Sequence, residues 1–277
     1  MKNFLDLRIK SNFNRKKFEF GLMKLGMRTF SILQYLGGLF LLFAMTLKYS
    51  VKRFTKREHF IEQLNKVGAN SILIVFLITL FTGIVLALQS AYAFKQFELE
   101  NLIPGMVALS MTRELGPVLI ALIIAGRVGA SMTAEIGTMK VTEQLDALES
   151  LATDPVRYLV VPRFLALVVA LPVLTIYGDF IGMLGGYLVG IWKLGIGSTM
   201  YQNLTFDALV YKDVFTGLIK SLFFAMIIAI VSCYEGMRTQ GGAEGVGKST
   251  TLSVVISFIL IIASDCFFTV LFYFVFE

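Results

Sequence analysis

Long apolar stretches separated by short polar ones make up most of this chain. Four stretches are clear, and each is long enough to cross a bilayer, which takes about 20 apolar residues in a helix. They are Ser71–Phe94, Ile103–Met132, Val214–Tyr234 and Leu252–Phe276. A fifth, Val156–Trp192, is too long for a straight crossing, so we expect it to begin on a membrane surface and to kink at Pro172. The pattern predicts an all-α integral membrane protein with five transmembrane helices.

A sixth apolar stretch, Thr29–Leu47, differs from the others in its flanks. Lys and Arg residues stand on both sides of it, at positions 24, 28, 48, 52 and 53. Positive charge at both ends disfavours crossing, and Gly37-Gly38 offers a central break. We therefore predict an N-terminal interfacial or re-entrant helix at 29–47. The preceding residues, 1–28, are basic and contain several phenylalanines, which predicts an extension lying on an anionic membrane surface.

The distribution of basic residues predicts the orientation. Residues 1–66 hold 14 of the 25 Lys and Arg residues. The polar segments that alternation places on the same side add Lys140, Arg157, Arg163, Arg238 and Lys248, whereas the opposite loops hold Lys95, Lys193 and Lys212. By the positive-inside rule, we expect a cytoplasmic N-terminus and a C-terminus on the outer side. The net charge of +6 thus fits lipid headgroups and topology, and no nucleic-acid partner is expected.

A polar segment, Glu135–Pro155, separates the second and third long apolar stretches. At about 100° per residue, its apolar and acidic side chains fall on opposite arcs. The apolar arc holds Val141, Leu145, Leu148, Leu151 and Ala152, and the acidic arc holds Glu143, Asp146 and Glu149. This predicts a cytoplasmic amphipathic helix of about three turns. It is either a solvated connection or a docking surface for a soluble partner.

Charged residues inside apolar stretches are costly and therefore mark candidate functional positions. Arg113 and Glu114 could neutralise each other or a polar headgroup, and Asp213 and Lys220 share one face of a helix. Asp179 and Asp265 have no evident partner. These two aspartates leave open an ion-coupled secondary transporter, although the chain shows no inverted repeat.

Two small-residue patterns have a structural explanation. Gly242–Ser249, GAEGVGKS, fits a phosphate-binding loop, but no strand precedes it and an apolar stretch follows it, so we interpret it as a cytoplasmic glycine-rich loop. Gly178, Gly182, Gly186 and Gly190 line one helix face. They favour close packing within one subunit over a dimer seam. No catalytic or metal site is predicted, because His59 is isolated and both cysteines lie in apolar stretches.

The run RELGPVLIALIIAGRVGASMTAEIGTMKVTEQLDALESLATDPVRYLVVPR, Arg113 to Arg163, closely resembles the MlaE family of ABC-transporter permeases, and GGAEGVGKSTT, Gly241 to Thr251, is similar to that family's loop before its last helix. The resemblance implies a homodimeric permease domain at 29–277, in the bacterial inner membrane. It further implies two cytoplasmic ATPase subunits that bind the ATP, an outer lipid-binding (MCE-type) partner, and phospholipid as substrate. The chain itself would hold no cofactor.

The resemblance also implies residue roles. The polar segment, at 135–153, corresponds to the helix that couples to the ATPase, with Glu135, Lys140, Glu143, Asp146 and Glu149 as candidate coupling residues. We expect the acidic arc to face the ATPase. The implied substrate path includes Arg113, Glu114, Asp213 and Lys220, with apolar lining from Leu86 and Leu88. Arg113 or Lys220 is expected to hold a lipid phosphate.

Overall fold

The computed structural model describes residues 27, 29–31, 33–50 and 57–276, apart from the side chains of Gln96 and Phe276. The prediction for residues 1–28 therefore lies almost entirely outside the described residues. The chain divides into two units, Met1–Ala44 and Met45–Glu277. The features below belong to the second unit unless stated otherwise.

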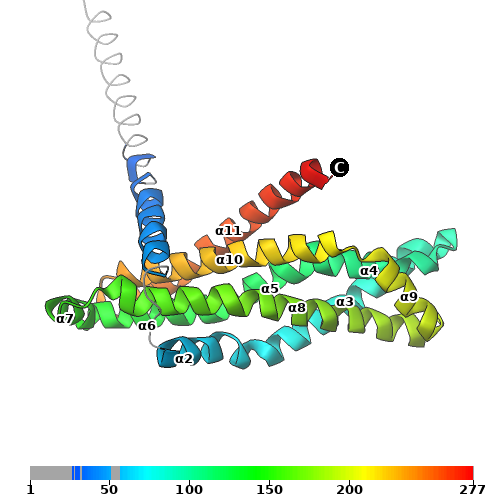
Figure 1. Cartoon of the computed structure of the whole chain (residues 1–277), viewed down its shortest axis with the longest axis horizontal. Coiled ribbons are helices and arrows are strands. Elements are labelled where there is room, and N and C mark those ends of the chain that lie inside the picture. Colours follow the sequence, from blue (N-terminus) through cyan, green and yellow to red (C-terminus); the bar gives the residue numbers. More distant parts are fainter. Residues whose placement is uncertain (1–26, 28, 32, 51–56, 277) are drawn as a thin grey trace, which may run out of the picture. The chain divides into compact units, whose positions relative to one another are not determined.

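Every regular element among the described residues of the second unit is helical (Figure 1). The α-helices are α2 (Arg57–Val67), α3 (Ile72–Phe94), α4 (Ile103–Ser110), α5 (Gly116–Ile124), α6 (Ala130–Val141), α7 (Gln144–Ser150), α8 (Val161–Trp192), α9 (Ser198–Ala208), α10 (Tyr211–Met237) and α11 (Gly242–Phe276). Three π-helical turns, η4 (Met111–Leu115), η5 (Ala125–Gly129) and η6 (Val156–Val160), and three 3₁₀ turns, η1 (Ala69–Ser71), η2 (Lys95–Phe97) and η3 (Glu100–Leu102), connect or extend them.

The described residues contain six helices that are long and apolar enough to cross a membrane. Five contain the predicted crossings: Arg57–Phe94, Glu100–Val141, Val156–Trp192, Tyr211–Met237 and Gly242–Val275. The sixth is Thr29–Ser50. It is helical through Gly37 and Gly38, so the predicted central break and re-entrant hairpin are wrong. Two adjacent glycines weaken a helix by about 1 kcal/mol each, which a long apolar helix can absorb.

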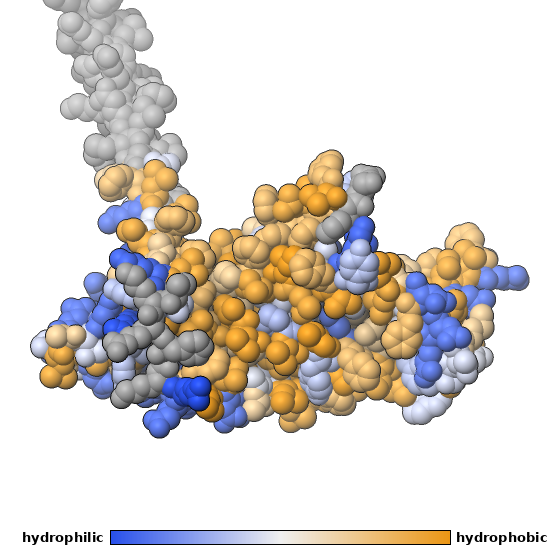
Figure 2. Space-filling model, viewed as in Figure 1, coloured by the Kyte–Doolittle hydropathy of each residue, from blue (hydrophilic) through white to orange (hydrophobic). Residues whose placement is uncertain are grey.

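Hydropathy varies along the second unit as a membrane requires. On the face shown in Figure 2, hydrophobic residues cover the middle, and hydrophilic residues gather at the end that carries α7 and at the end that carries α9. An apolar middle between two polar ends matches hydrocarbon between two headgroup layers. The chain is thus a multi-pass membrane protein.

Glycines allow α3 and α8 to pack at very short distance. A Cβ on Gly83 would overlap the carbonyl oxygen of Gly182, and one on Gly185 would overlap the carbonyl oxygen of Leu80. In lipid, where no hydrophobic force drives helices together, such close backbone contact supplies van der Waals attraction. The two helices therefore pack through their backbones.

The glycine face predicted on α8 packs entirely within the subunit. Space for a side chain at Gly178 is taken by Ile120, at Gly182 by Met111, at Gly186 by Val107 and Tyr201, and at Gly190 by Tyr201 of α9. Burial against these glycines raises the pKa of Tyr201 to about 12. The intrasubunit interpretation is confirmed, and a dimer seam along this face is excluded.

Local signals set several helix ends. Asp154 Oδ1 accepts a hydrogen bond from the backbone N–H of Val156 at 2.9 Å, so Asp154 caps the third long helix, and Pro155 follows it in the first turn. Gly241 and Gly242 have φ values of +90° and +67° at the turn between α10 and α11. This left-handed backbone favours glycine.

Candidate functional site

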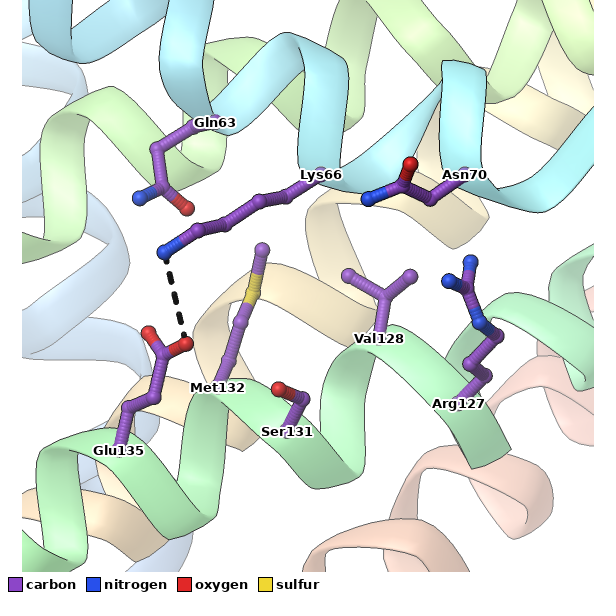
Figure 3. Close-up of a pocket in the computed structure, with 8 residues that line it drawn as sticks. All are labelled: Gln63, Lys66, Asn70, Arg127, Val128, Ser131, Met132 and Glu135. Carbon is purple, nitrogen blue, oxygen red and sulfur yellow. Dashed lines mark ion pairs between the residues drawn. The ribbon is translucent and has the colours of Figure 1, made fainter.

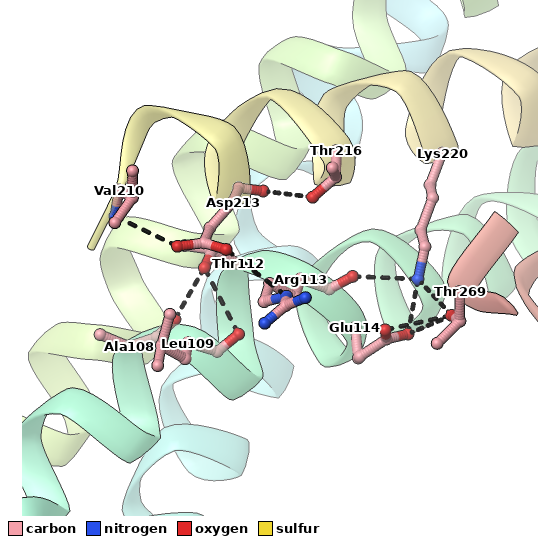
Figure 4. Close-up of polar contacts among 10 residues, drawn as sticks. All are labelled: Ala108, Leu109, Thr112, Arg113, Glu114, Val210, Asp213, Thr216, Lys220 and Thr269. Carbon is pink, nitrogen blue, oxygen red and sulfur yellow. Dashed lines mark hydrogen bonds and ion pairs between the residues drawn. The ribbon is translucent and has the colours of Figure 1, made fainter. Parts of the chain in front are cut away.

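Lys220 lies at the centre of a charged cluster formed by three helical segments (Figure 4). Its side chain is 1% exposed, and its Nζ lies 2.6 Å from Glu114 Oε2 and 2.9 Å from Asp265 Oδ1. Nζ also donates to Thr269 Oγ1 at 2.8 Å and to the carbonyl oxygen of Arg113 at 3.1 Å. The cluster joins η4, α10 and α11. A charge this deeply buried is tolerated because it is paired.

A second ion pair lies beside this cluster. Arg113 Nε is 3.5 Å from Asp213 Oδ1, and Asp213 Oδ2 accepts the backbone N–H of Val210 at the start of α10. The Arg113 side chain is 51% exposed, whereas that of Asp213 is 13% exposed. Arg113 therefore presents guanidinium N–H groups outward, while Asp213 caps and anchors the helix.

The π-helical turn η4 explains how Arg113 and Glu114 enter two different ion pairs. A π turn inserts one extra residue into an α-helix, shifts the side-chain register, and is frequent at functional sites. Within η4, Arg113 pairs with Asp213 and Glu114 pairs with Lys220. The prediction that Arg113 and Glu114 neutralise each other is therefore replaced by pairing with α10.

Two further expectations about these charges are corrected. Asp265 was predicted to lack a partner, but it pairs with Lys220, which is 45 residues away in sequence. Lys220 was a candidate phosphate ligand, but its three N–H donors already face Glu114, Asp265, Thr269 and the Arg113 carbonyl. Arg113, with its half-exposed side chain, is the better candidate.

Asp179 behaves as the sequence predicts. Its residue is 7% exposed, and its Oδ1 has no hydrogen-bond partner among the described residues. The carboxyl group lies over Gly116 of α5, where a Cβ would overlap Oδ1. The glycine therefore makes room for this carboxyl group between α5 and α8.

The two predicted lining leucines lie in different surroundings. Leu86 packs against a buried cluster on α3, α4 and η4 that consists of Ala87, Ala91, Ile103, Val107 and Met111. Leu88 is 43% exposed. Leu86 is half-buried by this packing, so Leu88 is the more accessible of the two to an external path.

The polar segment is a bent connection and not one continuous amphipathic helix. α6 runs to Val141, Glu143 adopts a left-handed backbone with φ of +60°, and α7 follows as a short helix. Lys140 Nζ pairs with Asp146 Oδ1 at 2.8 Å across the bend. The predicted three-turn helix is wrong in length, because the helix breaks at Thr142 and Glu143.

The two predicted arcs of this segment are partly confirmed. Leu145 is buried and Leu148 half-buried, but Leu151 is 76% exposed. The acidic residues Glu143, Asp146 and Glu149 are all exposed. An accessible acidic surface therefore exists, although only part of the apolar arc faces the protein.

Glu135 differs from the other candidate coupling residues. Its Oε2 accepts a hydrogen bond from Arg163 Nη2 at 2.9 Å, and its Oε1 lies 3.6 Å from Lys66 Nζ. Arg163 is 7% exposed and also donates to the Leu159 carbonyl. These contacts tie α2, α6 and α8 together directly before the polar segment, so Glu135 fixes the base of the segment.

The phosphate-loop lookalike forms the start of a helix. Gly242 to Ser249 are the first two turns of α11, so the predicted glycine-rich loop is wrong. Lys248 Nζ pairs with Glu244 Oε1 at 2.6 Å, one turn earlier, and both side chains are at least 75% exposed. Such a continuous helix offers no loop of backbone N–H groups around a phosphate.

Replacing Lys248 by Ala is accordingly expected to leave ATP turnover unchanged in membranes that contain the chain and its ATPase. An exposed i,i+4 pair contributes less than about 0.5 kcal/mol. The measurement is ATP hydrolysis per complex, with Lys193→Ala as a control for loss of one exposed lysine. Loss of hydrolysis in Lys248→Ala alone would contradict the helical interpretation.

The family model described as Permease MlaE matches residues 60–271, which include every helix of the charged cluster and the whole polar segment. The chain belongs to the MlaE permease family. As such it is an ABC transporter permease.

Several curated relatives of this MlaE-family permease are similar over most of their length. A probable ABC transporter permease protein of Rickettsia prowazekii is 50% identical over 213 residues, 77% of this chain and 82% of the relative. The intermembrane phospholipid transport system permease protein MlaE of Haemophilus influenzae is 37% identical over 218 residues, 77% of this chain and 83% of the relative. The chloroplastic protein TRIGALACTOSYLDIACYLGLYCEROL 1 of Arabidopsis thaliana is 37% identical over 205 residues, 59% of its length.

The structure of this MlaE-family permease adds residues that the sequence did not single out. Thr269 completes the cluster by bonding both Lys220 and Glu114. In the sequence, Arg163 and Lys66 only contribute to the predicted orientation in the membrane. In the structure, both side chains form ion pairs with Glu135. The sequence does contain one signal for Thr269. It lies four residues after Asp265, so both side chains are on one face of the last helix.

Proposed function

We propose that this permease is the membrane subunit of a transporter that moves phospholipid between the inner and outer envelope membranes, driven by a separate cytoplasmic ATPase. The observation that carries the proposal is the similarity to the intermembrane phospholipid transport system permease protein of Haemophilus influenzae, which extends over 83% of that relative. The charged cluster inside an otherwise apolar bundle suits a substrate with a charged head and apolar tails.

The proposed assembly contains two copies of this chain, two ATPase subunits and an outer lipid-binding (MCE-type) protein. We assign α11 to the contact with the second copy, because among the described candidate spans it is the least buried within the chain and it exposes large apolar side chains, including Val255, Ile259 and Phe267. The N-terminus and the polar segment are placed in the cytoplasm and the C-terminus on the outer side, by the distribution of Lys and Arg residues.

The proposed mechanism assigns different tasks to the charged residues. Arg113 holds the lipid phosphate with its exposed N–H groups, while Lys220 fixes Glu114 and Asp265 and so holds η4 and α11 in place. ATP binding by the partner shifts the permease between two states. Lipid moves only if its affinity differs between those states, and a change in the exposure of Arg113 would provide such a difference.

The alternative of an ion-coupled transporter has less support. Asp265 is paired with Lys220, so it lacks the free carboxyl group that the alternative needs. Asp179 remains an isolated buried carboxyl group. Membership in an ABC permease family also favours ATP as the energy source.

The test is a charge reversal on the exposed acidic surface. Glu143→Lys, Asp146→Lys and Glu149→Lys together should reduce co-purification of the ATPase at least ten-fold, because repulsion replaces attraction at a docking surface. Fluorescent phospholipid transfer between inner- and outer-membrane vesicles should fall in parallel.

A matched control makes the same charge change at the opposite end of the bundle, with Glu98→Lys, Glu100→Lys and Asp207→Lys. ATPase co-purification should stay at the wild-type level in this variant. Equal co-purification in both triple variants would rule out the acidic surface as the docking site. Transfer of lipid by the purified chain without ATPase or ATP would contradict the proposed function itself.

A further inference from the structure

A polar pocket lies between α2 and α6, away from the charged cluster around Lys220 (Figure 3). It has a volume of about 320 Å³, at the lower end of the range for small-molecule sites. Its walls come from the α2–η1 segment on one side and from η5 and α6 on the other. The lining residues are Gln63, Lys66, Asn70, Arg127, Val128, Ser131, Met132 and Glu135.

Helical spacing directs the polar side chains into this pocket. Gln63, Lys66 and Asn70 follow one another at three and four residues and therefore share one face of their helix. Arg127 and Ser131 do the same on the opposite wall. Figure 3 shows the two sets pointing toward each other across the pocket.

Most hydrogen-bond donors in the walls are left without a protein partner. Gln63 is only 9% exposed, yet its amide forms no hydrogen bond with any residue that the structure describes, and it points into the pocket. Asn70 and Ser131 are exposed, and their side chains are also unbonded within the described part of the chain. The amide and hydroxyl groups of these three side chains are therefore available to a ligand or to water.

Arg127 is anchored at one end and free at the other. Its Nη1 donates to Ser71 Oγ at 2.6 Å, and the fully buried Ser71 hydroxyl in turn donates to the Val67 carbonyl at 2.6 Å. A guanidinium group has five N–H donors, so the others remain available in the pocket. The anchor orients the group in advance, which lowers the entropic cost of binding a ligand.

The charges around the pocket favour an anion. Glu135 is the only carboxylate among the lining residues, and its two oxygens face Arg163 at 2.9 Å and Lys66 at 3.6 Å. Lys66 also pairs with Glu62 at 3.2 Å outside the pocket. Three cations against two carboxylates leave one net positive charge, together with free donors.

We propose that this pocket binds a phosphate group, held by Arg127 and Lys66 and by the amides of Gln63 and Asn70. In the orientation proposed above, the pocket opens at the cytoplasmic side, where the group belongs either to an anionic phospholipid headgroup or to a soluble phosphate. The site is separate from the proposed lipid path at Arg113, and its test needs neither ATP nor transport. Its failure therefore leaves the proposed function intact.

The experiment measures how a ligand protects a cysteine placed in the pocket wall. Ser131→Cys is introduced into the full-length chain with exposed Cys266 replaced by Ala, and buried Cys233 is retained. Maleimide alkylation is timed in dodecyl maltoside micelles, which contain no phosphate. The parent without Ser131→Cys gives the background rate.

Phosphatidylglycerol should slow alkylation, and at ten times its dissociation constant the slowing should be about ten-fold. Diacylglycerol with the same acyl chains should leave the rate unchanged. Arg127→Gln should weaken binding about ten-fold, because a charge-assisted hydrogen bond is lost, and so reduce protection to about two-fold. Asn70→Ala should also weaken protection, and it leaves the hydrogen bond between Arg127 and Ser71 intact. Arg157→Gln changes an exposed arginine outside the pocket and should leave protection unchanged.

Alkylation in inorganic phosphate is compared with alkylation in chloride at equal ionic strength. This comparison distinguishes a lipid headgroup from a soluble phosphate as the ligand. Protection by phosphatidylglycerol alone supports a lipid headgroup, and protection by inorganic phosphate as well supports the site with a soluble phosphate as its ligand. Three results would each overturn the proposal. They are equal protection by diacylglycerol, no protection by either phosphate compound, and full protection in both Arg127→Gln and Asn70→Ala.

Discussion

Replacing Lys220 by Met is expected to lower the free energy of unfolding by about 3–5 kcal/mol, the cost of removing one partner from a buried ion pair. Lys220 is 1% exposed and lies within 3 Å of carboxylate oxygens of both Glu114 and Asp265. Without the ammonium group, two carboxylates of like charge face each other in an apolar bundle. The Thr269 hydroxyl can donate only one hydrogen bond, so it replaces only part of the interaction that the two carboxylates lose.

Unfolding of the purified chain by SDS in mixed micelles, followed by circular dichroism, measures the effect. The triple variant Lys220→Met, Glu114→Gln and Asp265→Asn should recover most of the lost stability, because no unpaired charge remains. Lys193→Met, at an exposed position, should stay within about 0.5 kcal/mol of the wild type. A stable Lys220→Met variant, or a triple variant no better than the single one, would show that the cluster is not an energetic unit.

Adding one methyl group at Gly83 is expected to have the second-largest effect. A Cβ there would overlap the carbonyl oxygen of Gly182, and neither helix backbone can move without breaking the contact between α3 and α8. Overpacking costs about 1–3 kcal/mol, and Gly83→Ala should lie at the upper end because backbone, not a flexible side chain, is in the way.

Gly247→Ala is the matched control for this prediction. A Cβ at Gly247 would meet no atom within 4 Å, and the residue lies in α11, so alanine should stabilise the helix by up to about 1 kcal/mol. The same SDS titration compares the two variants. Equal stability of Gly83→Ala and wild type would mean that α3 and α8 separate readily in micelles.

The sequence predicted what depends on local pattern. Apolar runs of sufficient length directly predicted five of the candidate spans, because each residue in hydrocarbon must be apolar regardless of its neighbours. The glycine spacing on α8 correctly predicted close intrasubunit packing.

The errors have two physical origins, and the first is that side-chain partners come from distant segments. Asp265 and Lys220 are neighbours only because α10 and α11 pack together, and Arg163 reaches Glu135 only across the bundle. The bend at Glu143 requires a left-handed backbone at a non-glycine residue, for which the sequence carries no reliable signal. The predicted three-turn helix failed for that reason.

The sequence by itself determined a helical membrane protein, its apolar spans and the family to which it belongs, because hydropathy and motif spacing are properties of consecutive residues. Only the tertiary structure decided which charges neutralise one another, why Arg113 is half-exposed while Lys220 is buried, and that Gln63, Asn70 and Arg127 form one pocket. Those features depend on the packing of helices far apart in the chain, and a charge buried in a bilayer acquires its role from the partner that packing brings to it.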